Sequence, residues 1–336
     1  TEIYTLSLHD ALPIYDDTTS YMLQQINEHV FKDVDLVMSN AVKVTNHLKN
    51  KGLDTLKFVR NKVDNSYIYR DEFGVYRMTK FIHAEVFQTI SRPKDMRMLG
   101  LAVGKFLIGV SDFDATTLED TIPNFHNTRV RYEDFMLSAL KRMLDGDKDR
   151  VDKSREDLEF VISNKEIVGK IVDPLSRREI PTRVTHNDTK LSNVLFDRKL
   201  NVPRCMIDLD TVMKGSVLYD IADAIRSGAN THSGREQEYE YAKVDFELLT
   251  EFLVGFSEGA PGLLTPKEKE LLPIALKIIS LELGMRYLAD YYDGDVYFKS
   301  HYEDQNLYRA RLQFAVAKDI DKNMDEIQRI IEKVFN

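Results

Sequence analysis

Four polar residues near the middle of this 336-residue chain have the types and spacing that phosphoryl transfer requires. Asp188, Lys190 and Asn193 lie in one polar loop between β-prone runs, and Asp208 ends the next such run. Phosphoryl transfer needs a carboxylate to orient the accepting hydroxyl, oxygen ligands for Mg²⁺ and a cation on the transferring phosphate. An amide and one carboxylate suit Mg²⁺, because this ion keeps water and phosphate oxygens as its other ligands. The sequence therefore predicts an ATP-dependent kinase.

The order of these residues resembles a known signature. The motif THNDTK at 185–190, followed by IDLDT at 207–211, is similar to the His-Arg-Asp and Asp-Phe-Gly elements of protein kinases, with Asn187 in place of the Arg. This variant resembles the aminoglycoside phosphotransferase and choline kinase superfamily of small-molecule kinases, and the likeness extends to YDIA at 219–222. The resemblance implies an α+β, two-lobed protein-kinase-like fold with a small β-rich N-terminal lobe and a large, mainly helical C-terminal lobe.

A closer resemblance, to the N-acetylhexosamine 1-kinases, covers nearly all of the chain after about residue 20. That family uses ATP to phosphorylate the anomeric hydroxyl of N-acetylglucosamine or N-acetylgalactosamine, giving the sugar 1-phosphate. The resemblance makes this the expected function. The segments that carry it are LQQINEHVF at 23–31, TIPNFHNT at 121–128, THNDTK at 185–190, IDLDT at 207–211 and DGDVYF at 293–298.

The same resemblance implies a role for each residue of the motif. Asp188 becomes the catalytic base and contacts the acceptor hydroxyl. Lys190 contacts the γ-phosphate of ATP, and Asn193 and Asp208 bind Mg²⁺. ATP and Mg²⁺ are therefore the expected cofactors.

Three further residues are expected to support this site. His186 is expected to brace the loop, against Asp220. Asp210 has two interpretations of equal weight: it approaches the metal or the sugar, or it caps and braces its own turn.

The expected sugar contacts rest mainly on the resemblance. Polar loops alone predict ordinary turn chemistry, and the i, i+4 spacing of Glu282, Arg286 and Asp290 is also typical of a solvated ion-pair ladder. An N-acetylhexosamine needs hydrogen-bond donors and acceptors beside an apolar or aromatic surface, which these segments offer. Besides Asp188, the expected substrate-binding residues are His126, Asn127, Arg286, Tyr292 and Tyr297.

The chain is expected to divide at a hinge near residue 82. Residues 15–82 form the N-terminal nucleotide-binding lobe, with a helix over 33–49 and strands over 56–59, 67–70 and 75–82. Superfamily resemblance places adenine against the backbone of Lys80, Phe81 and Ile82. Residues 83–336 form the C-terminal catalytic and substrate-binding lobe. Its predicted helices cover 85–110, 130–144, 149–170, 219–228, 237–255, 266–292 and 304–334.

The N-terminal region departs from the superfamily pattern. The string LSLHDALPI at 6–14 resembles the translation of a sequencing adapter, so we expect residues 1–14 to be a non-native segment joined to a truncated gene. The glycine-rich turn that covers the nucleotide phosphates should lie just before Tyr21, yet the first glycine is Gly52. Strand 21–27 also carries Gln25 where kinases place a basic residue, so either Lys32 substitutes or the nucleotide is held differently.

Composition sets limits on partners and location. A net charge of −9 and a pI near 5.5 argue against a nucleic-acid partner. No apolar run reaches the length of a membrane span, and the single cysteine, Cys205, excludes an intrachain disulfide. We therefore expect a cytoplasmic protein. Its expected partners are a small sugar and ATP, and we expect it to be a monomer or weak dimer. Two alternatives stay open: a kinase of the same fold for an aminoglycoside, choline or homoserine, and a catalytically impaired binding protein.

Overall fold

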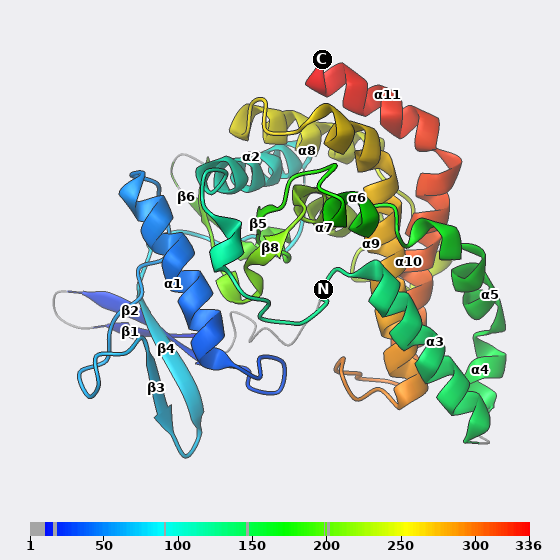
Figure 1. The fold of residues 1–336 in the computed structure, drawn as a ribbon, viewed down its shortest axis with the longest axis horizontal. Coiled ribbons are helices and arrows are strands. Elements are labelled where there is room, and N and C mark those ends of the chain that lie inside the picture. Colours follow the sequence, from blue (N-terminus) through cyan, green and yellow to red (C-terminus); the bar gives the residue numbers. More distant parts are fainter. Residues whose placement is uncertain (1–10, 16–18, 91, 146–147, 198, 200–201) are drawn as a thin grey trace.

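The computed structural model describes residues 11–15, 19–90, 92–145, 148–197, 199 and 202–336. Its elements form a small sheet-based lobe beside a larger helical lobe (Figure 1). The two-lobed α+β fold predicted from the sequence is therefore confirmed.

The N-terminal lobe is built on a four-stranded antiparallel sheet in the order β1-β2-β4-β3. Strand β1 begins inside the segment that we expect to be non-native, and it pairs with β2 along its whole length. The expected position of the glycine-rich turn, between these two strands, lies mainly outside the described residues. The strands are β1 (Ala11–Tyr15), β2 (Ser20–Ile26), β3 (Ile68–Asp71) and β4 (Gly74–Lys80).

Helix α1 (Val34–Asn50) covers one face of this sheet (Figure 1). Asp33 begins the helix because its side chain accepts a hydrogen bond from the Leu36 backbone, which satisfies one of the free N–H groups of the first turn. The buried face of α1 packs on inward-facing residues of the strands, such as Ile26 and Val75. The helix predicted over 33–49 therefore forms with nearly the predicted bounds.

The C-terminal lobe consists of helices around two short, two-stranded antiparallel sheets. One sheet pairs β5 (Arg183–Thr185) with β8 (Met213–Gly215), and the other pairs β6 (Val194–Asp197) with β7 (Val202–Met206). The helices are α2 (Pro93–Gly109), α3 (Thr128–Leu144), α4 (Asp149–Lys153), α5 (Arg155–Ser163), α6 (Val172–Ser176), α7 (Val217–Gly228), α8 (Phe246–Gly259), α9 (Pro266–Asp293), α10 (Gln305–Lys322) and α11 (Met324–Phe335).

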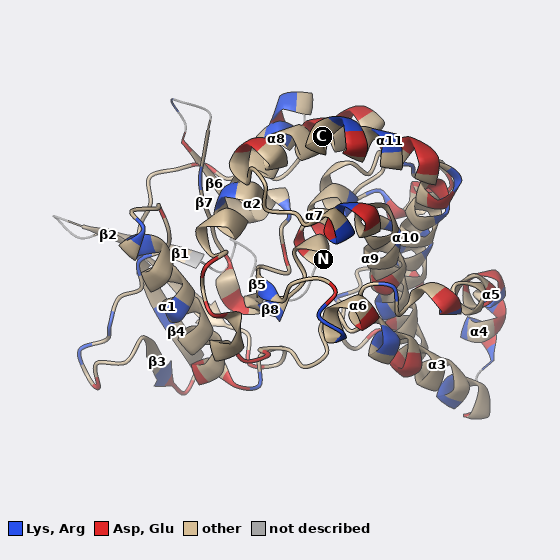
Figure 2. Cartoon of the chain, turned by 45° about the horizontal axis from the view of Figure 1, so that its top comes forward, with Lys and Arg blue, Asp and Glu red and all other residues tan. Residues whose placement is uncertain are grey.

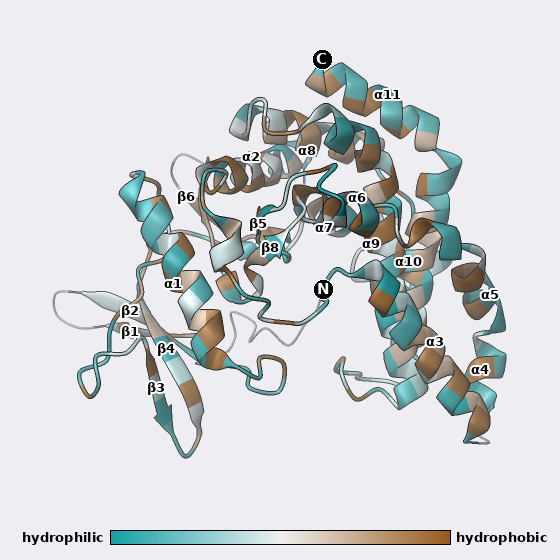
Figure 3. Ribbon diagram, in the orientation of Figure 1, coloured by the Kyte–Doolittle hydropathy of each residue, from teal (hydrophilic) through white to brown (hydrophobic). Residues whose placement is uncertain are grey.

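Hydrophobic residues concentrate where α2, α7, α8 and α9 meet, whereas α11 carries polar residues along its outer side (Figure 3). Helices α2 and α8 pack with their backbones close together. A Cβ atom at Gly100 would lie 2.0 Å from the Phe252 carbonyl oxygen, and one at Gly255 would lie 1.9 Å from that of Arg97. Only glycine allows this approach, which holds α2 against α8 in the C-terminal lobe.

Several predicted elements end at other residues than expected. Helix α2 begins at Pro93 rather than at residue 85, because proline suits the first helical turn and holds Arg92 in an extended conformation. The helix predicted over 237–255 is a 3₁₀ helix, η6 (Glu236–Tyr241), followed by α8. The strand predicted over 56–59 pairs only through Phe58, which bridges to β4.

Charged residues of both signs are interspersed along the helices seen in Figure 2. In the part of the chain that the structure describes, no helix has the length and apolar character of a membrane span.

Candidate active site

The loop after β5 carries the predicted catalytic residues, and α7 holds it in place. The carboxylate of Asp220 accepts hydrogen bonds from the backbone N–H groups of His186, at 2.8 Å, and Asn187, at 2.7 Å. Asn187 has a positive φ of 66°, which turns the chain sharply before Asp188. Burial raises the pKa of Asp220 to about 7, although both N–H groups favour its charged form. Asp220 thus braces the loop through its backbone.

His186 braces the same loop from its other side. The imidazole is fully buried, and its Nε2 atom is 2.9 Å from the Ile207 carbonyl oxygen, at the end of β7. Burial lowers the pKa of His186, so the ring is neutral. It therefore ties the loop to the strand that leads to Asp208 rather than acting on a substrate.

Asp188, Lys190 and Asn193 converge on one carboxylate oxygen. Oδ2 of Asp188 accepts hydrogen bonds from Lys190 Nζ at 2.9 Å and from Asn193 Nδ2 at 2.8 Å. Its other oxygen, Oδ1, is buried and has no partner among the described residues. Burial disfavours the charged amine of Lys190, but the carboxylates of Asp188 and Asp208 outweigh this and raise its pKa. The arrangement leaves one carboxylate oxygen of Asp188 ready to accept a proton.

Asp208 begins the short 3₁₀ turn η5 (Leu209–Thr211) in the left-handed conformation, with φ 61° and ψ 58°. Its Oδ1 atom is also buried without a partner among the described residues. Burial, together with the neighbouring Asp210, raises the pKa of Asp208 to about 7. An orphaned buried carboxylate oxygen is costly without a cation, so this site fits a metal ion.

The donor set fits Mg²⁺ in particular. The described residues contain no group of three or more His, Cys, Asp or Glu side chains arranged to hold a metal. Asn193 uses its amide N–H for Asp188, so its side-chain oxygen can serve as a ligand beside Asp208. One amide and one carboxylate suffice for Mg²⁺ when phosphates and water complete the shell.

Asp210 reaches the N-terminal lobe. Its carboxylate forms a hydrogen-bonded ion pair with the Arg77 guanidinium of β4, and both side chains are almost fully buried. Arg77 also donates two hydrogen bonds to the Gln24 side chain of β2, at 3.0 and 2.8 Å. The sequence did not single out Arg77. Arg77 could have been found from the alternation of side chains along β4, because Val75, Arg77 and Thr79 lie on the same buried face of this strand.

Gln25 points away from this cluster. Its side chain donates to the Phe73 carbonyl oxygen at 2.9 Å, in the turn between β3 and β4. Because successive residues of a strand face opposite sides, Gln24 rather than Gln25 faces the site. Lys32 lies near Glu28 at the exposed start of α1. Neither Gln25 nor Lys32 is therefore the basic group of the site, and Arg77 is the buried cation on this sheet.

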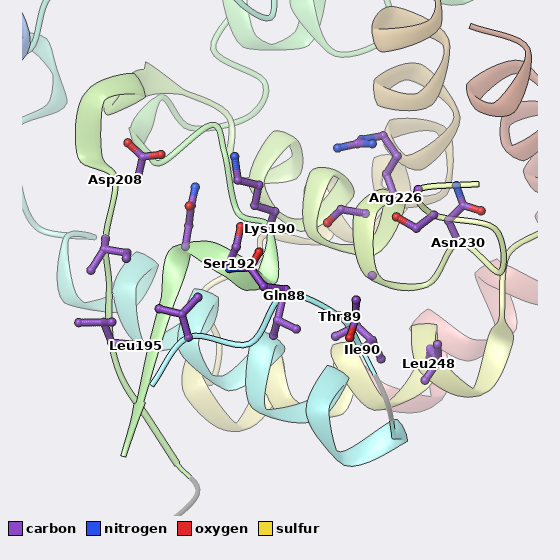
Figure 4. A pocket seen from close by; sticks show the side chains of 18 of the residues that line it. Gln88, Thr89, Ile90, Lys190, Ser192, Leu195, Asp208, Arg226, Asn230 and Leu248 are labelled. Atoms are coloured by element: carbon purple, nitrogen blue, oxygen red, sulfur yellow. The ribbon is translucent and has the colours of Figure 1, made fainter. Parts of the chain in front are cut away.

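A cavity of about 1320 Å³ runs from the hinge past the catalytic loop. Lys80, Phe81 and Ile82 line its hinge end, and none of the described residues hydrogen-bonds to the backbone of Ile82. Figure 4 shows Lys190 and Asp208 toward one end of the pocket and Asn230 toward the other. Ligand pockets usually measure about 300–1,000 Å³, so this cavity has room for a nucleotide and more.

His126, Arg286 and Tyr297 gather around α9, and none of the three is among the residues that line this cavity. His126 Nδ1 is 2.7 Å from the buried Glu282 carboxylate, and its ring lies 4.9 Å from that of Tyr219, the residue before Asp220. The Nε2 atom of His126 is buried and has no partner among the described residues.

Arg286 lies one helical turn after Glu282. Its guanidinium lies over the rings of Phe125, Tyr297 and Phe298, 5.0 to 5.9 Å from their centroids. No carboxylate in the described part of the chain forms an ion pair with Arg286. The spacing of Glu282, Arg286 and Asp290 therefore does not produce a solvated ion-pair ladder.

The other two expected sugar contacts have protein partners in the structure. Asn127 caps α3, because its side-chain oxygen accepts from the Val130 backbone at 3.4 Å. Tyr292 is buried, and its hydroxyl lies 2.8 Å from the Ser154 hydroxyl. Both side chains are engaged in holding helices together.

A buried carboxylate, a lysine and a second buried carboxylate oxygen without a partner among the described residues form the arrangement expected of a small-molecule phosphotransferase of the protein-kinase-like fold. The chain belongs to the phosphotransferase enzyme family APH, whose family model matches residues 15–250.

Three solved structures with the same fold are distant in sequence. An aminoglycoside phosphotransferase from Alicyclobacillus acidocaldarius aligns with a TM-score of 0.65 and 15% identity, covering 96% of this chain and 91% of its own. A spectinomycin phosphotransferase bound to ADP and spectinomycin aligns with 0.55 and 14%, covering 94% and 89%. An ethanolamine kinase from Plasmodium vivax aligns with 0.54 and 15%, covering 91% and 81%.

Proposed function

We propose that this chain transfers the γ-phosphate of ATP to the anomeric hydroxyl of an N-acetylhexosamine, N-acetylglucosamine or N-acetylgalactosamine, giving the sugar 1-phosphate. The observation that carries the proposal is the group formed by His126, Glu282, Arg286 and Tyr297. It combines an orphaned buried ring nitrogen, a guanidinium and aromatic faces. Hydroxyl and amide groups of a sugar can use those polar atoms, while its apolar face can lie on a ring.

Asp188 is the base in this proposal. Its Oδ1 atom, which has no partner among the described residues, orients the accepting hydroxyl and takes its proton. Lys190 and Asn193 hold the opposite oxygen, so the carboxylate cannot rotate freely. Mg²⁺, when bound by Asn193 and Asp208, neutralises charge that develops on the phosphoryl oxygens.

The nucleotide is expected to lie between the hinge and this centre. The backbone N–H groups of Lys80 and Phe81 already donate to Lys57 and Ser20, at 2.8 and 2.9 Å. Adenine would therefore use the backbone of Ile82. Lys190, at the other end, can turn from Asp188 to the γ-phosphate when ATP binds.

The decisive experiment measures ATP- and Mg²⁺-dependent phosphorylation of both N-acetylhexosamines, glucose, galactose, choline and kanamycin. Phosphorus NMR then locates the phosphate in the product. Selective formation of the N-acetylhexosamine 1-phosphate would support the proposal, and transfer to choline or kanamycin alone would refute it in favour of a cationic acceptor. A second protein, with a glycine-containing hairpin before Tyr21, tests whether ATP binding needs the glycine-rich turn. No transfer by either chain would favour the binding-protein alternative.

A further inference from the structure

The buried pair between Arg77 and Asp210 is the feature that the proposed reaction leaves without a use. It joins β4 to the turn η5, residues that lie 133 positions apart in the chain. The side chains of Arg77 and Asp210 are only 2% and 6% exposed. A buried pair of this kind gives weak evidence for stability, because desolvation of both charges offsets their attraction. Its position beside Asp208 calls for another explanation.

The guanidinium is held rigidly on the sheet. Gln24 and Arg77 stand directly opposite each other on β2 and β4, and the Gln24 side-chain oxygen accepts from both Nε and Nη2 of Arg77. The third contact, through Nη1, goes to Asp210. These hydrogen bonds leave the Arg77 side chain little conformational freedom, so the sheet sets the position of Asp210.

The turn that Asp210 belongs to is fixed from a second element of the same lobe. Asn40, on the buried face of α1, donates to the Val212 carbonyl oxygen at 3.0 Å. Asp208 itself stands at the start of η5 in the left-handed conformation, which is uncommon for a residue other than glycine. Such a conformation persists when its surroundings determine it. Here the N-terminal lobe holds Asp210 and Val212, on either side of Thr211, while Thr211 itself is hydrogen-bonded to His186 and Asn187.

We propose that Arg77 is a positioning residue that, through Asp210, sets the geometry of the metal ligand Asp208. Its guanidinium contacts Gln24 and Asp210 rather than Asp208 itself. Partners behind a metal ligand commonly change metal affinity about 10–100-fold when they are removed. The inference rests on the proposed role of Asp208 in binding Mg²⁺.

The test uses a double variant, Arg77→Met with Asp210→Leu, because removing both charges leaves no unpaired buried ion. Calorimetry measures the affinity for ADP with and without Mg²⁺, and thermal unfolding checks the fold. We expect the gain in ADP affinity that Mg²⁺ provides to fall about tenfold or more, while affinity for metal-free ADP stays the same. Should the double variant not fold, Asp210→Asn alone is measured in the same way.

Two controls separate this inference from the proposed function. Arg70→Met breaks the exposed 2.6 Å pair between β3 and Asp35, so it removes an arginine–aspartate contact of the N-terminal lobe without touching η5. Asp208→Asn removes the negative charge of the proposed metal ligand itself. If Asp208→Asn abolishes the Mg²⁺ effect and the folded double variant keeps it, the role of Arg77 is refuted and the metal site stands.

Two other outcomes would also overturn the positioning role of Arg77. Equal losses in ADP affinity with and without Mg²⁺ would show general damage to the N-terminal lobe and overturn the positioning role. ADP binding that does not depend on Mg²⁺ in the unaltered chain, or that Asp208→Asn leaves unchanged, would remove the metal site and this inference with it.

Discussion

Replacing Asp188 with asparagine separates catalysis from folding more cleanly than any other change at this site. Both of its side-chain hydrogen bonds, from Lys190 and Asn193, reach the same oxygen. The asparagine side chain of the Asp188→Asn variant can therefore keep both bonds with its own oxygen and place its NH₂ where Oδ1 now lies without a partner. Bonds to a charged acceptor are each worth roughly 1 kcal/mol more than bonds to a neutral one, so the free energy of unfolding should fall by only about 2 kcal/mol.

The effect on turnover should be much larger. Removing a general base typically lowers the rate about 10²–10⁴-fold, which corresponds to about 3–5 kcal/mol in the activation barrier. We expect kcat of Asp188→Asn to fall by that factor while the KM for ATP stays within about threefold, since the metal ligands remain. A coupled ADP-release assay measures the rates, and urea unfolding measures stability.

The control is Asn193→Ala, which should raise the Mg²⁺ concentration needed for half-maximal activity. Turnover of a folded Asp188→Asn protein at the unaltered rate would refute the base assignment. A kcat loss accompanied by collapse of the Mg²⁺ dependence would show that the carboxylate acts on the metal instead.

Three further outcomes follow from buried groups. Asp220→Ala should lower the free energy of unfolding by about 3 kcal/mol in urea, because two buried backbone N–H groups lose their acceptor; an unchanged midpoint would contradict this. Arg286→Met should raise the KM for the sugar about tenfold without changing that for ATP, and the opposite pattern would remove Arg286 from the acceptor site. Burial raises the pKa of Cys205 to about 12, so above about pH 8.5 only the unfolded chain loses the thiol proton. The free energy of unfolding should therefore fall by up to about 1.4 kcal/mol per pH unit. Cys205→Ala should flatten the slope of Tm between pH 8.5 and 9.5.

The sequence predicted best where local chemistry decides the structure. The start of α9 was readable because Thr265, Pro266 and Glu268 form a capping box with proline in the first turn, and the structure contains both of its hydrogen bonds. The catalytic loop was likewise predictable, since Asp188, Lys190 and Asn193 lie within six consecutive residues and so must converge. In both cases the interacting groups are neighbours in the chain.

Sequence reasoning is less decisive where one polar side chain could serve either a structural partner or a substrate. Asn127 is a polar loop residue that resembles a substrate contact, yet it also precedes a helix, and the structure gives its oxygen to the cap of α3. Tyr292 carries a hydroxyl in a helix rich in apolar residues, and Ser154, from a segment 138 positions earlier, meets it in the core. Nothing in the local spacing distinguishes these outcomes from sugar binding.

Arg77 illustrates the same difficulty, because a residue that the sequence would place on the surface is buried. An arginine in a strand normally predicts an exposed side chain, because burying an unpaired guanidinium is prohibitive. Two carbonyl or carboxylate groups from other elements make the burial tolerable here, and one of them, Asp210, belongs to the motif that identifies the family. Since Asp210 must have a cation once it is buried beside Asp208, a search for inward-facing basic residues on the strands would have found Arg77. The pairing therefore joins the two lobes beside Asp208, the residue that we propose as a metal ligand.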